Sequence, residues 1–263
     1  MTDESATAAA YAPPALPAVR KIGFADLDEA LAKGWQDFRS KPGHVLLLAI
    51  IYPIIGLVLA RLTFGYDVLR LLYPLAAGFA FLGPFAALGF YEISRQREQG
   101  REPSWWGVLD LLRGKQRGSI LALGGLLLVI FFAWIGIAEA IFEALFGPEP
   151  VVTLSGFVRE VFETPEGKRL ALIGNAVGLL FALVVFSISV VSFPLLVDRD
   201  VGAPAAIVTS VKAVLKNPLI MLAWAGIIAA ALIVGSLPFF IGLAIVLPVL
   251  GHASWHLYRK VVV

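Results

Sequence analysis

The apolar residues of this chain lie in long runs, and the charged residues lie almost entirely between them. The chain is 59% hydrophobic and only 15% charged, whereas an average soluble domain is about 25% charged. A helix needs about 20 apolar residues to cross the hydrocarbon core of a bilayer. Several runs reach this length, so the sequence predicts an all-α fold, a polytopic membrane helical bundle.

Six of these runs are predicted to be membrane spans. They cover His44–Ala60, Val68–Tyr91, Ser119–Phe146, Leu170–Val197, Leu219–Ser236 and Leu237–Leu257. The last two have almost no loop between them, which predicts a tight hairpin around Gly235–Pro238. Residues 1–22 lack the pattern of a signal peptide and are expected to form a disordered cytoplasmic tail. Residues 23–263 are expected to form one six-span membrane domain.

Lys and Arg residues are distributed unequally between alternate gaps. Most precede the first span, follow the second or fourth span, or lie at the C-terminus, and few lie in the other gaps. Loops rich in these residues stay on the cytoplasmic side. With six spans, both termini are therefore expected in the cytoplasm, and the chain is expected in the bacterial inner membrane.

Amphipathic stretches come before the first, third and fifth spans. Apolar residues from Phe24 to Phe38 recur at helical spacing, and charged residues such as Asp37 take the other faces. Similar stripes begin at Trp105 and Ile207. The sequence thus predicts an interfacial helix before each odd-numbered span.

The spans that return to the cytoplasm also resemble one another. Pro84 aligns with Pro248 without a gap, which places Glu92 on His256, and Pro194 gives a looser match. Parallel repeats with a pseudo-threefold axis along the membrane normal would explain this pattern, in contrast to the inverted repeats of many transporters. The three expected repeats cover about residues 23–98, 99–201 and 202–263.

Polar residues gather at the cytoplasmic ends of the returning spans. Each acid has a basic neighbour within one turn, and a charge at the rim can reach water, which lowers the cost of placing it there. Two interpretations are open: a ring of salt bridges that locks the repeats together, or a polar cytoplasmic vestibule. The candidate residues are Glu92, Arg95, Asp198, Arg199, His252, His256 and Arg259.

His252 and His256 are one helical turn apart, so their imidazoles are expected on the same face. Such a pair could hold a metal or supply a haem ligand, and His44 could approach it. The alternative is a place in an aromatic belt beside Trp255. No third ligand follows at zinc-site spacing, so no metal or cofactor is predicted.

Small and polar residues within the third and fourth spans have structural explanations. Gly174, Asn175 and Gly178 form a small-xxx-small motif, which lets helices approach closely, and Asn175 is also the best polar candidate within an apolar run. Glu139 and Glu143 are expected where the third span leaves the lipid, with a proton relay or cation site as the alternative. Kinks are expected at Pro84, Pro194, Pro238 and Pro248.

Several motifs of the chain recur together in one known family. They are Gly34-Trp35-x-Asp37 with Pro42, Gly83-Pro84 with Gly89-x-Tyr91-Glu92-x-Ser94-Arg95, Ser192-Phe193-Pro194 through Arg199, Lys216-Asn217-Pro218, and Leu247-Pro248 through Arg259. With these motifs the chain resembles the bacterial integral membrane proteins grouped as domain of unknown function 2189. The resemblance implies a polytopic inner-membrane protein with no established activity. A cytochrome c oxidase label on some relatives finds little support, because a haem–copper core needs many intramembrane histidines.

The sequence contains no nucleophile elbow, phosphate-binding loop or zinc-protease helix. Cysteine is absent, which excludes disulfides and thiolate chemistry. We therefore expect a non-enzymatic accessory, assembly or envelope-homeostasis component, with the lipid bilayer and other membrane proteins as partners and no nucleic acid. The alternatives are a transporter or channel for a small or lipid-like substrate, and a haem- or metal-binding membrane protein.

Overall fold

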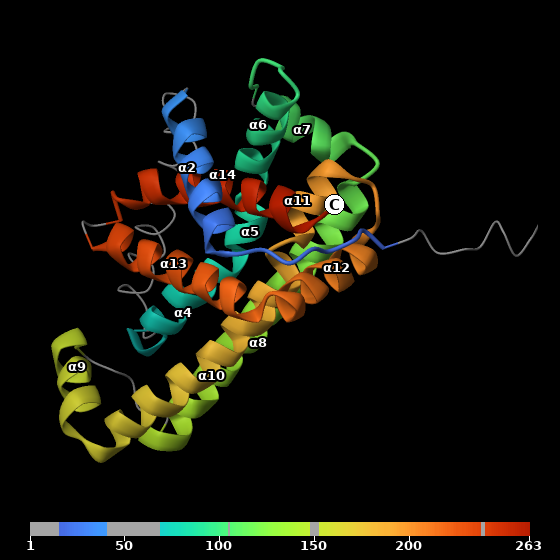
Figure 1. Cartoon of the computed structure of the whole chain (residues 1–263). Helices are drawn as coiled ribbons and strands as arrows, with labels where there is room; N and C mark the ends of the chain where they lie inside the picture. The colour runs from blue at the N-terminus through green and yellow to red at the C-terminus, as the bar shows by residue number, and fades with distance from the viewer. Residues whose placement is uncertain (1–15, 41–68, 105, 148–152, 238–239) are drawn as a thin grey trace, which may run out of the picture.

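The computed structural model describes residues 16–40, 69–104, 106–147, 153–237 and 240–263. Apart from one antiparallel bridge between Val19 and Val262, the regular structure of these residues is helical (Figure 1). The predicted all-α class is therefore confirmed. The predicted first span, His44–Ala60, lies outside the described residues, as does Pro238.

Four segments of the described chain are long and apolar enough to cross a membrane, by length and composition. They are Leu72–Glu98, Arg117–Phe146, Pro165–Asp198 and Pro218–Ser236. They overlap the predicted second to fifth spans. The helix that overlaps the predicted sixth span, α14 (Leu243–Val261), is not among the four, and its second half carries the polar residues from His252 to Lys260.

Two of the four segments are interrupted near a proline. The first segment follows the short lead-in helix η1 (Leu69–Leu71) and consists of α4 (Leu72–Phe79), η2 (Ala80–Leu82), α5 (Gly83–Ala86) and α6 (Leu88–Glu98). The third segment consists of α10 (Pro165–Ser189) and α11 (Ser192–Asp198). Proline lacks the amide that would donate to the carbonyl four residues earlier. The breaks lie within four residues of Pro84 and Pro194, whereas Pro248 lies inside the continuous helix α14.

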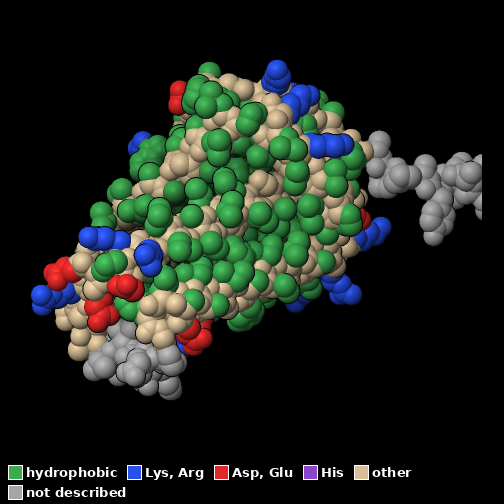
Figure 2. Space-filling model, turned by 90° about the horizontal axis from the view of Figure 1, so that it is seen from below, with side chains coloured by type: hydrophobic (Ala, Val, Ile, Leu, Met, Phe, Trp, Pro, Cys, Tyr) green, Lys and Arg blue, Asp and Glu red, His purple; other side chains and the backbone are tan. Residues whose placement is uncertain are grey.

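A long hairpin of α8 (Arg117–Phe146) and α10 extends away from the other helices, and α9 (Leu154–Glu163) lies at its far tip (Figure 1). Hydrophobic side chains cover much of the face seen in Figure 2, and charged side chains lie mainly around its edges. Such a wide apolar surface indicates contact with a membrane or a partner. The exposed apolar residues of the two hairpin helices include Leu126, Leu128, Val129, Phe132, Leu172, Leu179, Leu180 and Val184.

Trp134 of α8 holds the first three candidate spans together. A Cβ built on Gly78 of α4 would lie 2.8 Å from the Trp134 ring, and one built on Gly178 of α10 would lie 3.1 Å from it. The indole Nε1 donates a hydrogen bond to the carbonyl oxygen of Pro74 at 2.8 Å. Of the two glycines in the predicted packing motif, Gly178 therefore makes the close approach, whereas a Cβ on Gly174 would meet nothing within 4 Å.

Three helices at the positions of the predicted interfacial helices pack against the interrupted or polar ends of other segments. α2 (Phe24–Ser40) lies along α14, α7 (Trp106–Arg113) contacts α6 and the start of α8, and α12 (Ala203–Lys216) contacts α10 and α11. The remaining candidate span, α13 (Pro218–Ser236), packs on α14. Each of α2, α7 and α12 thus meets a segment from another of the three predicted repeats.

Residues just before α2 are held by the C-terminus and by the turn between α12 and α13. The backbone amide of Arg20 donates to the carbonyl oxygen of Val261 at 2.9 Å. The amide of Ile22 donates to Asn217 Oδ1, also at 2.9 Å. Residues 18–22 of the predicted tail therefore have backbone hydrogen bonds to distant segments. Such pairing leaves no local signal in the sequence.

Candidate functional site

The second half of α6 is the centre of a layer of polar side chains between packed helices. α6 is buried through most of its length, including Glu92, Ser94 and Gln96, because α7, α11 and α14 pack around it and Asp37 of α2 contacts it. Buried polar groups require hydrogen-bond partners, and here each helix supplies some of them. We use the term polar layer for Asp37, Glu92, Ser94, Arg95, Gln96, Arg97, Glu98, Asp198, Arg199, His252, His256, Tyr258 and Arg259.

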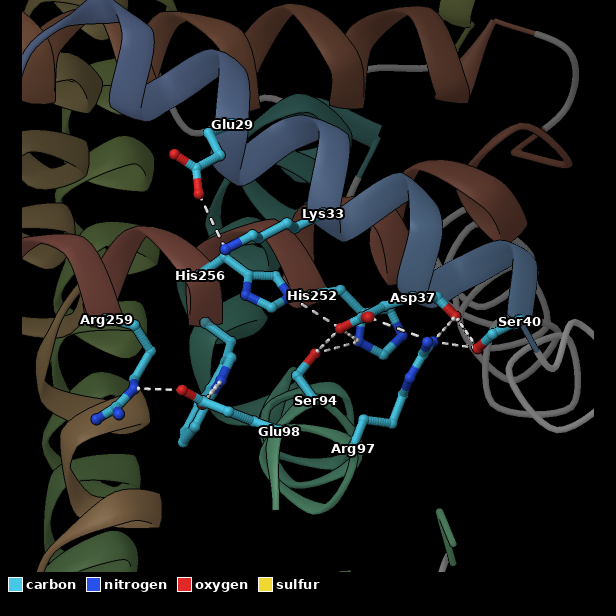
Figure 3. Close-up of polar contacts among 11 residues, drawn as sticks. Glu29, Lys33, Asp37, Ser40, Ser94, Arg97, Glu98, His252, His256 and Arg259 are labelled. Carbon is cyan, nitrogen blue, oxygen red and sulfur yellow. Dashed lines mark hydrogen bonds and ion pairs between the residues drawn. The ribbon is translucent and has the colours of Figure 1, made fainter. Parts of the chain in front are cut away.

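Asp37 of α2 is the first anionic centre of the polar layer (Figure 3). Its Oδ2 accepts hydrogen bonds from Ser94 Oγ at 2.6 Å and from His256 Nε2 at 2.9 Å, and its Oδ1 lies 3.2 Å from Arg97 Nη1. Burial alone would raise the pKa of Asp37, but the hydrogen bonds from His256 and Ser94 outweigh burial and lower it. An ionised carboxylate therefore joins α2, α6 and α14.

A close helix contact places Asp37 at this position. Gly34 lies one turn before Asp37, and a Cβ built on Gly34 would lie only 2.6 Å from the backbone nitrogen of Ala253 in α14. The missing side chain lets the two helix backbones approach. Consequently, the short Asp37 side chain reaches His256, which is one turn beyond His252 and Ala253.

His252 is fully buried, and its protonation follows from its neighbours. Its Nδ1 lies 2.8 Å from Ser94 Oγ. Since Ser94 gives its only proton to Asp37, Nδ1 carries a proton and donates it to Ser94. The Nε2 atom is then an acceptor, and it has no hydrogen-bond partner among the described residues. Hydrogen bonds thus connect His256, Asp37, Ser94 and His252 in one chain.

Asp198 at the end of α11 is the second anionic centre. Its Oδ2 accepts a hydrogen bond from the Tyr258 hydroxyl at 2.6 Å and lies 3.3 Å from a guanidinium nitrogen of Arg199 and of Arg259. Arg259 also donates from Nε to Glu98 Oε1 at 3.0 Å. Burial and the bond to Asp198 raise the pKa of Tyr258. Burial alone would lower the pKa of Arg259, but Glu98 and Asp198 outweigh burial and raise it.

Glu92 is the third anionic centre and is 1% exposed. Arg95 Nε donates to its Oε2 at 2.7 Å, and Gln96 Nε2 donates to its Oε1 at 2.8 Å. A cavity of about 310 Å³ adjoins this cluster between α6 and α7. Both positively and negatively charged side chains line this cavity, including Arg101 and Asp110. The cavity therefore has no strong preference for an anion or a cation.

The structure divides the seven candidate rim residues among these three clusters. Glu92 lies with Arg95, Asp198 with Arg199 and Arg259, and His252 and His256 with Asp37. Side chains of α14 bond to Asp37 of α2, Glu98 of α6 and Asp198 of α11. Glu98 has a second donor on α14, since Trp255 Nε1 donates to its Oε2 at 3.1 Å. The contacts therefore include salt bridges between predicted repeats.

Sequence reasoning missed six residues of the polar layer as site residues: Asp37, Ser94, Gln96, Arg97, Glu98 and Tyr258. Asp37 and Ser94 stand in the motifs of the family resemblance, which was the available signal. Arg97 and Glu98 occur in a charged run, where nothing distinguishes a buried partner from a solvated residue. Asp37 was expected on the polar face of α2, and that face meets α14 instead of water.

The histidines do not form a metal site with other described residues. No group of three or more His, Asp and Glu side chains in the described part of the chain is placed to hold a metal ion. His256 Nε2 and His252 Nδ1 are already bonded to Asp37 and Ser94. His44 lies outside the described residues.

A separate ion pair lies toward the far tip of the hairpin. Arg70 Nη2 bonds Glu139 Oε1, and the same nitrogen lies 3.8 Å from Glu143 Oε1. We call Arg70, Glu139 and Glu143 the tip ion pair. Nearby segments are also joined by the Tyr73 hydroxyl, which donates to Asn175 Oδ1 at 2.7 Å. Glu139 and Glu143 thus have a cationic partner from the lead-in to α4, and Asn175 links two spans.

Comparison with known proteins agrees with this architecture. No curated protein and no solved structure matches the chain. The family model described as "Predicted integral membrane protein (DUF2189)" matches residues 72–198, which run from the start of α4 to the end of α11 and include three of the four candidate spans. Over these residues, just under half of its length, the chain is similar to this family of predicted integral membrane proteins.

Proposed function

We propose that the protein is a non-enzymatic component of the bacterial inner membrane, acting as an accessory, assembly or envelope-homeostasis factor. The observation that carries this proposal is the closed charge pairing of the polar layer. Asp37, Glu92 and Asp198 each have cationic or hydrogen-bonding partners within the chain. A buried group that is already paired gains little from a substrate and loses its partner if it reorganises.

The exposed surface supports the same proposal. Exposed apolar side chains on the α8–α10 hairpin offer a large area for lipid tails and for helices of other membrane proteins. Association between helices in lipid depends on packing and not on the hydrophobic effect. A partner would therefore be recognised by the shape of this surface.

We propose six spans, with both termini cytoplasmic, and three parallel repeats. Cyclic packing supports the repeats: α2 of the first unit packs on α14 of the third, α7 of the second on α6 of the first, and α12 of the third on α11 of the second. The unequal distribution of Lys and Arg supports the orientation. Two fusions test the orientation, one with a reporter after residue 65 and one with a reporter after residue 263. Six spans place these two positions on opposite sides of the membrane.

Site-specific photo-crosslinking in native membranes tests the proposed function. A photoreactive residue at Val129 or Leu180, which are 66% and 64% exposed, should give a protein adduct of reproducible mass from at least one position. The same variants purified in detergent are the control and should lose that adduct. Lipid adducts alone at both positions, together with solute flux in reconstituted vesicles, would refute the proposal.

A proton-coupled transporter is the second candidate, because one observation favours it. The hydrogen-bonded chain from His256 through Asp37 and Ser94 ends at His252 Nε2, which has no hydrogen-bond partner in the described part of the protein. Such a chain can pass protons between a partly exposed and a buried imidazole. Vesicles with an internal pH dye would reveal proton flux that Ser94→Ala abolishes; equal dye responses with the protein and with empty vesicles would exclude this function.

A further inference from the structure

Helix α9 has two neighbouring apolar stripes, and only one of them packs on the protein. Phe157 and Val161 are partly buried, and the Phe157 ring lies 5.9 Å from the Phe142 ring of α8. Val158 comes directly after Phe157, and Phe162 directly after Val161; Val158 and Phe162 are 46% and 73% exposed. The exposed stripe is therefore not needed to hold α9 on the hairpin.

Local contacts hold α9 in a fixed position against the tip of the hairpin. Thr164 ends α9 and caps α10, since its Oγ1 accepts a hydrogen bond from the Gly167 amide at 3.0 Å. A Cβ built on Gly167 would lie 2.4 Å from Val161 Cα, so the two backbones touch at the turn. α9 thus folds back against the tip of the hairpin as a fixed element.

Helix α10, which follows α9 in the chain, also exposes apolar residues. Leu172 in the second turn of α10 is 73% exposed, and Leu179 and Leu180 further along are 59% and 64% exposed. These residues belong to a candidate membrane span. Phe162 lies next to the start of this span, where Lys168 and Arg169 are also exposed. Apolar and charged side chains meet in this way at the level of lipid headgroups.

We propose that α9 is an interfacial anchor that lies in the headgroup layer at the tip of the α8–α10 hairpin, with Val158 and Phe162 inserted into the bilayer. The opposite side of α9 is polar: Glu160 and Glu163 are exposed, and Arg159 Nε lies 2.8 Å from Glu163 Oε2. Amphipathic helices of this kind bury their apolar face about 5–10 Å into the boundary between headgroups and acyl chains.

The charges of α9 indicate which lipids it needs. Its sequence, LSGFVREVFE, has one Arg and two Glu. Helices that depend on anionic lipids carry clusters of Lys and Arg, and salt weakens their attachment. α9 is therefore held by apolar insertion, and we expect the same insertion in zwitterionic and in partly anionic bilayers.

The absence of cysteine makes this proposal directly testable. Phe162→Cys and Val158→Cys, each labelled with a polarity-sensitive fluorophore, are placed in phosphatidylcholine vesicles that contain doxyl-labelled lipid. Both fluorophores should emit at shorter wavelength and be quenched by the doxyl group. Glu160→Cys on the polar face is the matched control and should be quenched far less, while adding anionic lipid should change none of these results.

Two outcomes would overturn the proposal. If a membrane-impermeant thiol reagent modifies Phe162→Cys as fast as Glu160→Cys and doxyl lipid does not quench its label, the stripe faces water. If Phe162→Cys forms a disulfide-linked dimer within the vesicles, the stripe faces a second copy of the chain. Val158→Cys provides a second position on the stripe should one variant fold poorly.

Discussion

The charged residues of the polar layer and those at the tip of the α8–α10 hairpin differ in how many other parts of the protein contact them. In the polar layer, side chains from α2, α6, α11 and α14 satisfy one another across helices far apart in sequence. At the tip, the ion pair and α9 have their contacts, among the described residues, with the lead-in to α4 and the ends of α8 and α10. We infer that protein contacts stabilise the polar layer and that the bilayer stabilises much of the tip.

The largest expected effect comes from Asp37→Ala. The substitution leaves the donors of Ser94, His256 and Arg97 without their shared acceptor. Removing one partner of a buried charge pair costs about 3–5 kcal/mol, so thermal unfolding in detergent should occur at a clearly lower temperature. Lys33→Ala on the same helix, which removes an exposed pair with Glu29, is the control. Equal losses for both variants would mean that Asp37 does not organise the layer.

Acid should remove the same interaction without a substitution. The folded state lowers the pKa of Asp37, so its contribution is present above the unfolded value of about 3.9 and is lost as pH falls through the lower folded value. The difference in unfolding free energy between the wild type and Asp37→Asn should therefore shrink in this acidic range. A difference that stays constant down to the lowest pH at which the protein folds would contradict an ionised Asp37.

Gly34→Ala should destabilise the contact between α2 and α14. The added Cβ would lie 2.6 Å from the Ala253 backbone nitrogen, and overpacking of this kind costs about 1–3 kcal/mol. Gly174→Ala is the matched control, because its Cβ would meet nothing within 4 Å and alanine favours a helix. Circular dichroism melting of both variants measures the difference. A stabilised Gly34→Ala variant would show that the helices are not in close contact.

Four of the six predicted spans overlap segments long and apolar enough to cross a membrane, whereas the polar layer was predicted only in part, for a physical reason. Hydropathy is a local property, so the runs now found in α8, α10 and α13 could be recognised without knowing what surrounds them. Asp37, by contrast, is important because it bonds Ser94 and His256, which lie 57 and 219 positions further along the sequence. Its helical periodicity placed it correctly on the polar face of α2, but periodicity does not distinguish a face that meets water from one that meets another polar helix.

Arg70→Met should have a smaller effect than the substitutions in the polar layer. The Arg70 and Glu139 side chains are 16% and 24% exposed, so the pair is only partly buried. Loss of a hydrogen bond to a charged group costs about 1.5–3 kcal/mol when both groups are buried, and access to water reduces this to about 1 kcal/mol. The expected loss of unfolding free energy in detergent is therefore well below that of Asp37→Ala. A loss as large would mean that the tip, too, is stabilised mainly by protein contacts.

Arg159→Ala should have the smallest effect and sharpens the comparison at the tip. Arg159 and Glu163 are 76% and 60% exposed, and an exposed pair one turn apart on a helix contributes about 0.3–0.5 kcal/mol. Neither unfolding in detergent nor its salt dependence should change measurably. If the bilayer holds α9 through the apolar stripe, the quenching of a label at Phe162→Cys should also persist in the Arg159→Ala background. Loss of that quenching would mean that the polar face, and not the apolar stripe, attaches α9.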